Sequence, residues 1–106
     1  MSRPEPAQVY AALGDPTRLK LVLRLAKESR LSISALSSGV AISRQGLTKH
    51  LRLLEESGLV QSQRVGRELR FDLVPAAIER ASEFLDQIGA LWEARLDRIK
   101  AFVEAD

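Results

Sequence analysis

The segment SRQGLTKHLRLLEESGLV, residues 43–60, places its hydrogen-bonding and cationic side chains at its beginning. Leu47, Leu51 and Leu54 recur at i, i+4 and i+7, which predicts a helix with one apolar face. The opposite face carries Arg44, Gln45, Thr48, Lys49 and Arg52. The acids follow only at residues 55 and 56, although the helix dipole favours acids at the N-terminus and bases at the C-terminus. We therefore expect a negatively charged partner at the N-terminal half of this helix.

DNA is the polyanion that these residue types recognise, because Arg and Lys pair with guanine and Gln pairs with adenine. We predict that the helix contacts DNA through Ser43, Arg44, Gln45, Thr48, Lys49, His50 and Arg52. His50 either faces a phosphate or packs at the helix edge. Gly46 either allows DNA or the preceding helix to approach closely, or has no such role. The alternative for the whole set is an ordinary solvated helix face.

The elements before this helix complete a helix-turn-helix pattern over residues 34–57. Ser43 is expected to cap the helix, and Gly58 to end it in a left-handed conformation. Ser34 is expected to cap a short helix over residues 35–38, which Gly39 ends. A short helix, a turn that contains Gly and a longer polar-faced helix are typical of this motif.

Two further helices are predicted near the N-terminus. Residues 7–13 form the first, with Val9, Tyr10 and Leu13 on its apolar side. Asp15 caps the second, Pro16 is its first residue, and it runs to about Lys27. Its inward-facing residues are expected to be Leu19, Val22, Leu23 and Ala26. A small strand is expected at residues 31–33.

The pattern changes from helical to alternating over residues 59–74. Leu69, Phe71 and Leu73 alternate with polar residues, which predicts a β-hairpin with Gly66 at its tip. A two-stranded ribbon directly after a recognition-type helix is a wing. We expect it to contact DNA through Arg64, Arg67 and Arg70.

One long helix is predicted from Pro75 to the end of the chain. Apolar residues step by threes and fours along one face: Leu85, Ile88, Trp92, Leu96, Ile99 and Val103. Left exposed, this face would be a large apolar patch, and a second copy of the chain is the simplest cover. We expect a homodimer in which residues 1–14 and 75–106 pair, so that Val9 and Tyr10 join the interface. The alternative is that the helix folds back on its own domain.

Length and composition limit the remaining possibilities. The 106 residues are enough for one domain, and the net charge of +2 combines basic segments at 18–30 and 43–70 with an acidic tail. The chain has no Cys and one His, so neither a disulfide, a thiolate metal site nor a nucleophile–base pair is expected. We expect no enzyme activity, no cofactor and no metal. With neither a signal-peptide-like start nor an apolar run of membrane length, we expect a bacterial cytoplasmic protein associated with the nucleoid and no membrane partner.

These motifs resemble the ArsR-type winged-helix transcriptional repressors. The residues that carry the resemblance are ALGDPTRLKLVLRLA, LSISALS, the segment 43–60 and RVGRELRFDL, in matching order from about residue 8 to 74. The tail LWEARLDRIKAFVE resembles the last helix of a subgroup that lacks the well-known metal sites. The resemblance implies a homodimer, paired through its first and last helices, that binds an inverted-repeat operator and usually represses.

The chain departs from the family at the metal-sensing positions. Members that sense metals often have two Cys flanking a Val just before the third helix, where this chain has Ser32, Ile33 and Ser34. Other members carry a site with His and Asp on the last helix, and residues 75–106 contain no His. Ser hydroxyls are poor ligands for soft metals. The metal response is therefore not expected here.

The sequence as a whole predicts a mostly α fold with a small β-hairpin wing. This is a single winged helix-turn-helix domain over residues 1–106, with about five helices and a long C-terminal dimerisation helix. The function we expect is a homodimeric, sequence-specific DNA-binding regulator, most simply a repressor of a small operon or of its own gene. The alternative is a winged-helix module for protein–protein contact without sequence-specific DNA binding. A small-molecule effector or partner protein is not visible in the sequence.

Overall fold

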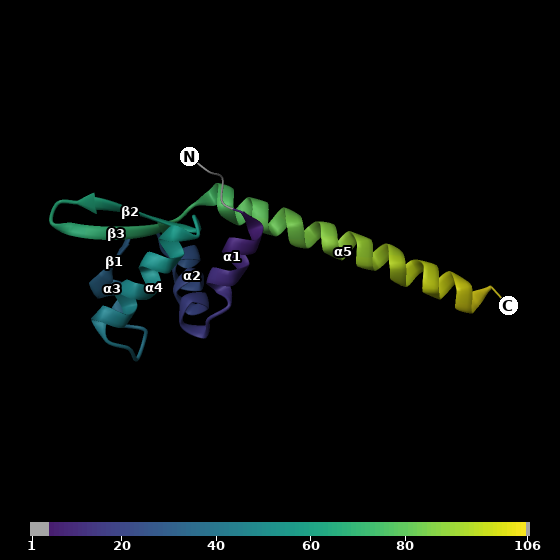
Figure 1. Cartoon of the computed structure of the whole chain (residues 1–106), viewed down its shortest axis with the longest axis horizontal. Helices are drawn as coiled ribbons and strands as arrows, with labels where there is room; N and C mark the ends of the chain where they lie inside the picture. The colour runs from purple at the N-terminus through teal and green to yellow at the C-terminus, as the bar shows by residue number, and fades with distance from the viewer. Residues whose placement is uncertain (1–4, 106) are drawn as a thin grey trace.

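The computed structural model describes residues 5–105, which form a small head and one long projecting helix (Figure 1). The elements in chain order are α1 (Pro6–Leu13), α2 (Pro16–Lys27), β1 (Leu31–Ser32), α3 (Ile33–Ser37), α4 (Arg44–Glu56), β2 (Val60–Val65), β3 (Glu68–Leu73) and α5 (Pro75–Glu104). The predicted mostly α fold with a wing is confirmed.

Side-chain caps fix where the helices begin. The Asp15 carboxylate accepts the N–H of Arg18 at 3.0 Å at the start of α2, and Ser43 Oγ accepts the N–H of Gly46 at 3.0 Å at the start of α4. Both predicted caps are confirmed. The expected cap at Ser34 is wrong, because Ser32 Oγ accepts the N–H of Ala35 at 3.1 Å and α3 already begins at Ile33. Ser32 takes this role because it ends β1 in an extended conformation.

The sheet has three antiparallel strands in the order β1-β3-β2. Val65 pairs with Glu68, so the hairpin closes through a two-residue turn, Gly66-Arg67. Gly66 has a φ of +64°, which a Gly at the first central position of such a turn adopts without strain. Gly58, with a φ of +83°, ends α4 in the left-handed conformation that the sequence predicted.

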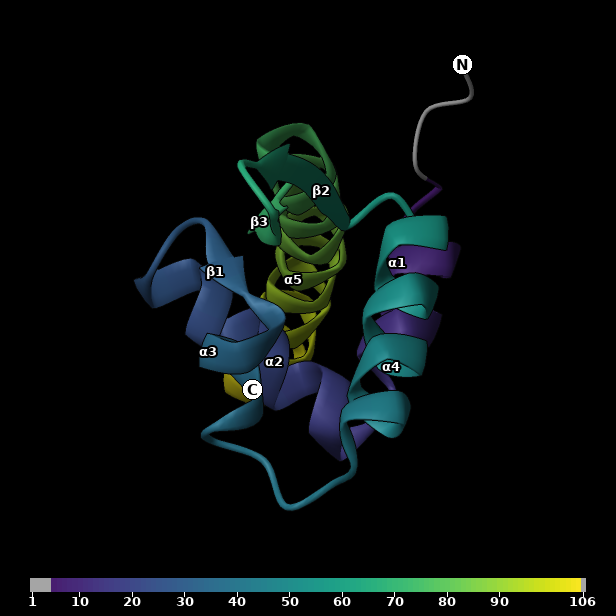
Figure 2. The ribbon, with the colours of Figure 1, turned by 90° about the vertical axis from the view of Figure 1, so that its left-hand side faces the viewer.

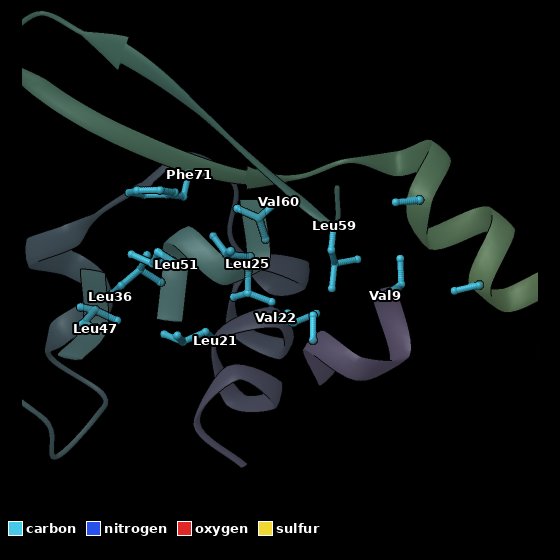
Figure 3. Packing of buried hydrophobic residues seen from close by; sticks show 14 residues of the cluster. Val9, Leu21, Val22, Leu25, Leu36, Leu47, Leu51, Leu59, Val60 and Phe71 are labelled. Carbon is cyan, nitrogen blue, oxygen red and sulfur yellow. The ribbon is translucent and has the colours of Figure 1, made fainter. Parts of the chain in front are cut away.

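The core lies between α2, α4 and the sheet (Figure 3). Leu47, Leu51 and Leu54 of α4 are fully buried, as predicted, and Phe71 of β3 belongs to the same buried cluster. The inward face expected for α2 is largely wrong, because Leu21, Val22 and Leu25 are buried, whereas Leu19, Leu23 and Ala26 are exposed. The sequence pattern did not identify the buried face because α2 has apolar residues on both sides of the helix.

Helix α1 connects the head to α5. The Tyr10 hydroxyl donates to the Ala81 carbonyl, and the Tyr10 ring lies 6.2 Å from that of Phe84. Val9 was expected at the dimer interface, but it is 1% exposed within the subunit. It belongs to the core, in the same buried cluster as Ala77 and Ala81 of α5.

Helix α5 leaves the head after its first two turns. All residues from 82 to 105 are exposed, and the described chain extends over 69 × 33 × 20 Å. The view from the wing side shows α5 receding from the head rather than returning to it (Figure 2). The alternative that this helix folds back on its own domain is therefore wrong. Within the described residues, no helix is long and apolar enough to cross a membrane.

Candidate nucleic-acid interface

The exposed face of α4 carries four side chains in one row. Gln45, Thr48, Lys49 and Arg52 stand at i, i+3, i+4 and i+7 and line a shallow hollow of about 360 Å³. Gln45, Lys49 and Arg52 are exposed, and Thr48 is half-buried. Since the core takes the opposite face of α4, the exposed Gln45, Lys49 and Arg52 remain available to a ligand.

Local hydrogen bonds set the first turn of this helix. The Thr48 hydroxyl donates to the Arg44 carbonyl at 2.9 Å, so its proton is used within the helix. A Cβ on Gly46 would lie 3.3 Å from Ser43 Oγ, the capping oxygen. No other helix lies as close to that position, so the absent Cβ leaves room for the cap rather than for the preceding helix.

The wing approaches the beginning of α4 on one side. Arg44, Arg64, Arg67 and Glu68 line a common hollow of about 250 Å³ together with the start of α3. Arg64 pairs across the hairpin with Leu69, so its side chain is on the same face of the wing as the core. Three guanidinium groups from two elements therefore border one concave surface.

Arg70 lies apart from these cations. Alternation along β3 puts Arg70 on the face opposite Leu69 and Phe71, where it lines a different hollow with Arg30 and Asp72. Its Nη2 is 3.0 Å from Glu68 Oε2, and its Nε donates to the same oxygen at 3.1 Å. The structure thus separates Arg70 from the other two predicted wing residues.

His50 faces the start of α2 rather than the exposed row. Its Nδ1 is 3.3 Å from Arg18 Nη1 and 3.8 Å from Asp15 Oδ2. Arg18 Nε also donates to the Ala12 carbonyl at 2.6 Å, so the cluster joins α1, α2 and α4. The N–H of Arg18, followed by the charges of His50 and Arg18, holds the pKa of Asp15 below its ordinary value despite the opposing effect of burial. Of the two options for His50, packing at the helix edge is the one observed.

The cations of the candidate interface have no internal acid partners. Among the described residues, ion pairs form only at Arg24–Glu28, His50–Asp15 and Arg70–Glu68. Arg44, Lys49, Arg52, Arg64 and Arg67 are therefore unpaired within residues 5–105. Arg24 also donates to the Leu36 carbonyl and Ser38 Oγ, at 3.5 and 3.4 Å, so it fastens α2 to α3 rather than facing this surface.

The second exposed surface is the apolar face of α5. Its expected members remain uncovered in the single subunit, with exposures from 41% for Leu96 to 69% for Val103: Leu85, Ile88, Trp92, Leu96, Ile99 and Val103. Arg95 lies over the Trp92 ring at 5.4 Å. A second row, Phe84, Leu91 and Phe102, was missed. Its spacings of seven and eleven residues, which return to the same side of a helix, were the signal.

The positions at which a soft metal would bind carry hydroxyl groups. Of the two residues at these positions, Ser32 and Ser34, the first uses its Oγ to cap α3. Across residues 5–105, no three His, Cys, Asp or Glu side chains come together as a metal-binding group. These residues do not fit a thiophilic metal.

Comparison with known proteins gives consistent matches. Residues 13–63 match a family model described as a helix-turn-helix domain. The chain is 30% identical to the arsenical resistance operon repressor of Escherichia coli (strain K12), over 92% of this chain and 81% of that protein. It is 39% identical to the solved structure of an ArsR-like transcriptional regulator from Rhodococcus sp. RHA1, with a TM-score of 0.78, covering 95% of this chain and 94% of that one.

A third comparison concerns the fold alone. The homodimeric winged helix-turn-helix DNA-binding domain Mb0332 from Mycobacterium bovis is 21% identical, with a TM-score of 0.61, covering 87% of this chain and 82% of that one.

Proposed function

This chain belongs to the ArsR family of winged helix-turn-helix transcriptional regulators, and from that premise we propose that two copies bind an inverted-repeat operator and repress transcription. The proposal extends to the residues. Gln45, Thr48, Lys49 and Arg52 lie in the major groove, and Arg44, Arg64 and Arg67 contact the phosphate backbone. Ser43 positions the first turn, and His50 orients α4 from behind.

The single observation that carries the proposal is the set of unpaired cations around α4 and the wing. Five of them border two adjoining hollows, and none has an acid partner within the described residues. Phosphate contacts of this kind give affinity, whereas the amide of Gln45 on the exposed row of α4 supplies a bidentate contact suited to adenine. The geometry therefore supports both positioning on DNA and base reading.

The dimer is supported by the exposed face of α5. Six large apolar side chains in one row exceed what a monomer normally leaves in contact with water. The M. bovis neighbour is described as homodimeric. Tyr10, which touches Phe84, lies at the base of this face. A two-fold pairing of α5 helices would set two α4 helices at a fixed spacing, which an inverted repeat requires.

We further propose that metals do not release this regulator from DNA. The E. coli relative is named for arsenical resistance. Here the chain has no Cys, and the hydroxyl of Ser32 is used in a helix cap. The signal that controls this chain is therefore of another chemical class.

Selection of bound duplexes from a random pool tests the proposal. We expect an inverted repeat with half-sites about one helical turn apart, and binding that falls steeply as salt rises. A variant without two of the positive charges, Arg44→Gln combined with Arg64→Gln, is the control for phosphate contacts and should lose affinity for all duplexes. Recovery of no common sequence, together with salt-independent retention, would favour the alternative of a protein-interaction module.

A further inference from the structure

Helix α2 presents an apolar face that neither the core nor the candidate DNA surface uses. Leu19 and Leu23 are 45% and 55% exposed and stand one turn apart, and Ala26 continues the same row. Exposing two large apolar side chains to water is unfavourable in free energy, and a partner that buried them would gain that free energy. The unpaired cations of the DNA surface lie on α4 and the wing, so DNA is not the cover.

We propose that the distal half of α5 from the second subunit packs on this α2 face, which Leu19, Leu23 and Ala26 form and which we name the α2 seat. This inference rests on the proposed homodimer and adds a contact to it. Each subunit would then hold the other by its own projecting helix, and the pairing would be reciprocal.

The reach of α5 fits this arrangement. From Ala81, the last buried residue of α5, to Glu104, the helix spans about 35 Å at 1.5 Å per residue. The described chain measures 33 Å across its second dimension. The projecting part is therefore long enough to cross the head of a second subunit.

The apolar face on α5 is also too wide for one helix to cover. The row at Leu85, Trp92 and Ile99 and the row at Phe84, Leu91 and Phe102 together span an arc of roughly 120° at 3.6 residues per turn. A seam between two helices needs only a narrow stripe. The partner's α5 covers part of this face, and a further apolar surface is needed for the rest.

The charges beside the two apolar rows are complementary. Lys20 and Lys27, seven residues apart, follow one edge of the α2 seat. Asp86 and Glu93, also seven residues apart, follow one edge of the α5 face, and Asp97 continues it. Among the described residues none of these five side chains has an ion-pair partner. The matched spacing aligns bases of one subunit with acids of the other.

Disulfide cross-linking tests the contact directly, because the chain has no Cys of its own. Leu23→Cys is combined in one chain with Trp92→Cys, Leu96→Cys, Ile99→Cys or Val103→Cys. Within one subunit α5 leads away from α2, so a disulfide must join two copies (Figure 1). We expect a covalent dimer for at least one of these pairs. The controls Ala94→Cys and Ala101→Cys, on the opposite side of α5, should give none with Leu23→Cys.

A stability measurement provides the second readout. Leu23→Glu should weaken the dimer by roughly tenfold or more, because it places a charge in a desolvated contact. Val65→Glu, at a residue of similar exposure on the wing, should not change it. Charge reversal tests the ion pairs. One chain carries Lys20→Glu and Lys27→Glu on α2, and a second chain carries Glu93→Lys and Asp97→Lys on α5. A dimer of these two different chains should form in preference to a dimer of either chain with itself.

The outcomes separate the two proposals. A wild-type chain that sediments as a monomer at micromolar concentration overturns the homodimer and the seat together. A wild-type dimer that Leu23→Glu leaves intact, with no cross-link to any distal α5 position, overturns the α2 seat alone.

Discussion

Trp92 is the residue at which the proposed dimer can be tested most quantitatively. It lies in the middle of the apolar row of α5 and is 51% exposed in the single subunit. A Trp side chain buries up to about 250 Å², so pairing could remove up to about 125 Å² per subunit from water. At about 25 cal/mol/Å², the upper limit is about 3 kcal/mol per Trp.

A realistic contact between two α5 helices buries about half of the exposed Trp92 area in each of the two subunits. We therefore expect Trp92→Ala to cost about 2–4 kcal/mol of dimer stability, or roughly 30- to 1000-fold in the dimer Kd. Sedimentation equilibrium measures this directly. Ala94→Gln, on the opposite side of α5, is the matched control and should leave the Kd unchanged.

The wild-type protein offers an independent readout, because Trp92 is its only Trp. Its fluorescence emission should shift to the red on dilution through the dimer Kd, as the ring returns to water. An emission maximum that does not change with concentration, together with an unaltered Kd for Trp92→Ala, would refute the reasoning. Trp92 would then lie outside the subunit contact.

Three further expectations concern DNA, metal and pH. Arg67→Ala, at the exposed turn of the wing, should weaken binding to operator and scrambled duplex alike and lower the salt slope of binding by about 1 per subunit. Arg70→Ala is the control and should change this slope less, because the Arg70 guanidinium is held by Glu68. Equal salt slopes for the two variants would argue against the wing contact. Operator affinity should be the same with Zn²⁺, with a thiol-reactive arsenical or with a chelator, and a tenfold loss with stoichiometric Zn²⁺ would contradict the proposed insensitivity. Asp15 has a lowered pKa in the folded chain, so its charge stabilises the fold fully above its unfolded pKa of about 3.9, and this contribution is lost as the pH falls through the lower folded pKa. Asp15→Asn, which keeps a capping side chain, should unfold at lower urea than the wild type at pH 7, and this difference should shrink as the pH is lowered toward 3. A difference that stays constant from pH 7 to pH 3 would show that the charge is not the cause.

Much of the fold could be predicted because local signals and the apolar pattern agree. Asp15 with Pro16, and Ser43 with Gly58, define helix ends by chemistry that involves only neighbouring residues. Leu47, Leu51 and Leu54 lie on one side of a helix whose other side is polar, so the buried face was unambiguous. The resemblance to the ArsR-type repressors then supplied the arrangement of these elements.

The errors arose where local chemistry offers two solutions. Ser32 and Ser34 are both capable caps, and only the pairing of β1 with β3 decides between them. Helix α2 has Leu at residues 19, 21, 23 and 25, so its apolar pattern does not identify the core face. Val9 and Tyr10 are neighbours in sequence, yet Val9 lies in the core and Tyr10 reaches Ala81 on α5, which depends on contacts far along the chain.

The candidate DNA residues could also be placed from the sequence where local spacing decides, and not where contacts between distant elements decide. Gln45, Thr48, Lys49 and Arg52 share a face by helical spacing alone, so the sequence could group them. His50 is adjacent to Lys49, but its ring turns toward Arg18 and Asp15 of another helix. The separation of Arg70 from Arg64 required the register of the hairpin, which the turn at Gly66 sets.

The central claim is that the exposed face of α4 reads base pairs. The most direct measurement compares wild type and Gln45→Ala on the selected operator, on operators with each half-site base pair changed in turn, and on a scrambled duplex, across a salt titration. We expect Gln45→Ala to lose about 1–3 kcal/mol of discrimination at one base pair per half-site, with the salt slope nearly unchanged, because an amide contacts a base without displacing a counterion. A variant that binds every duplex with the wild-type order of preference would contradict the claim.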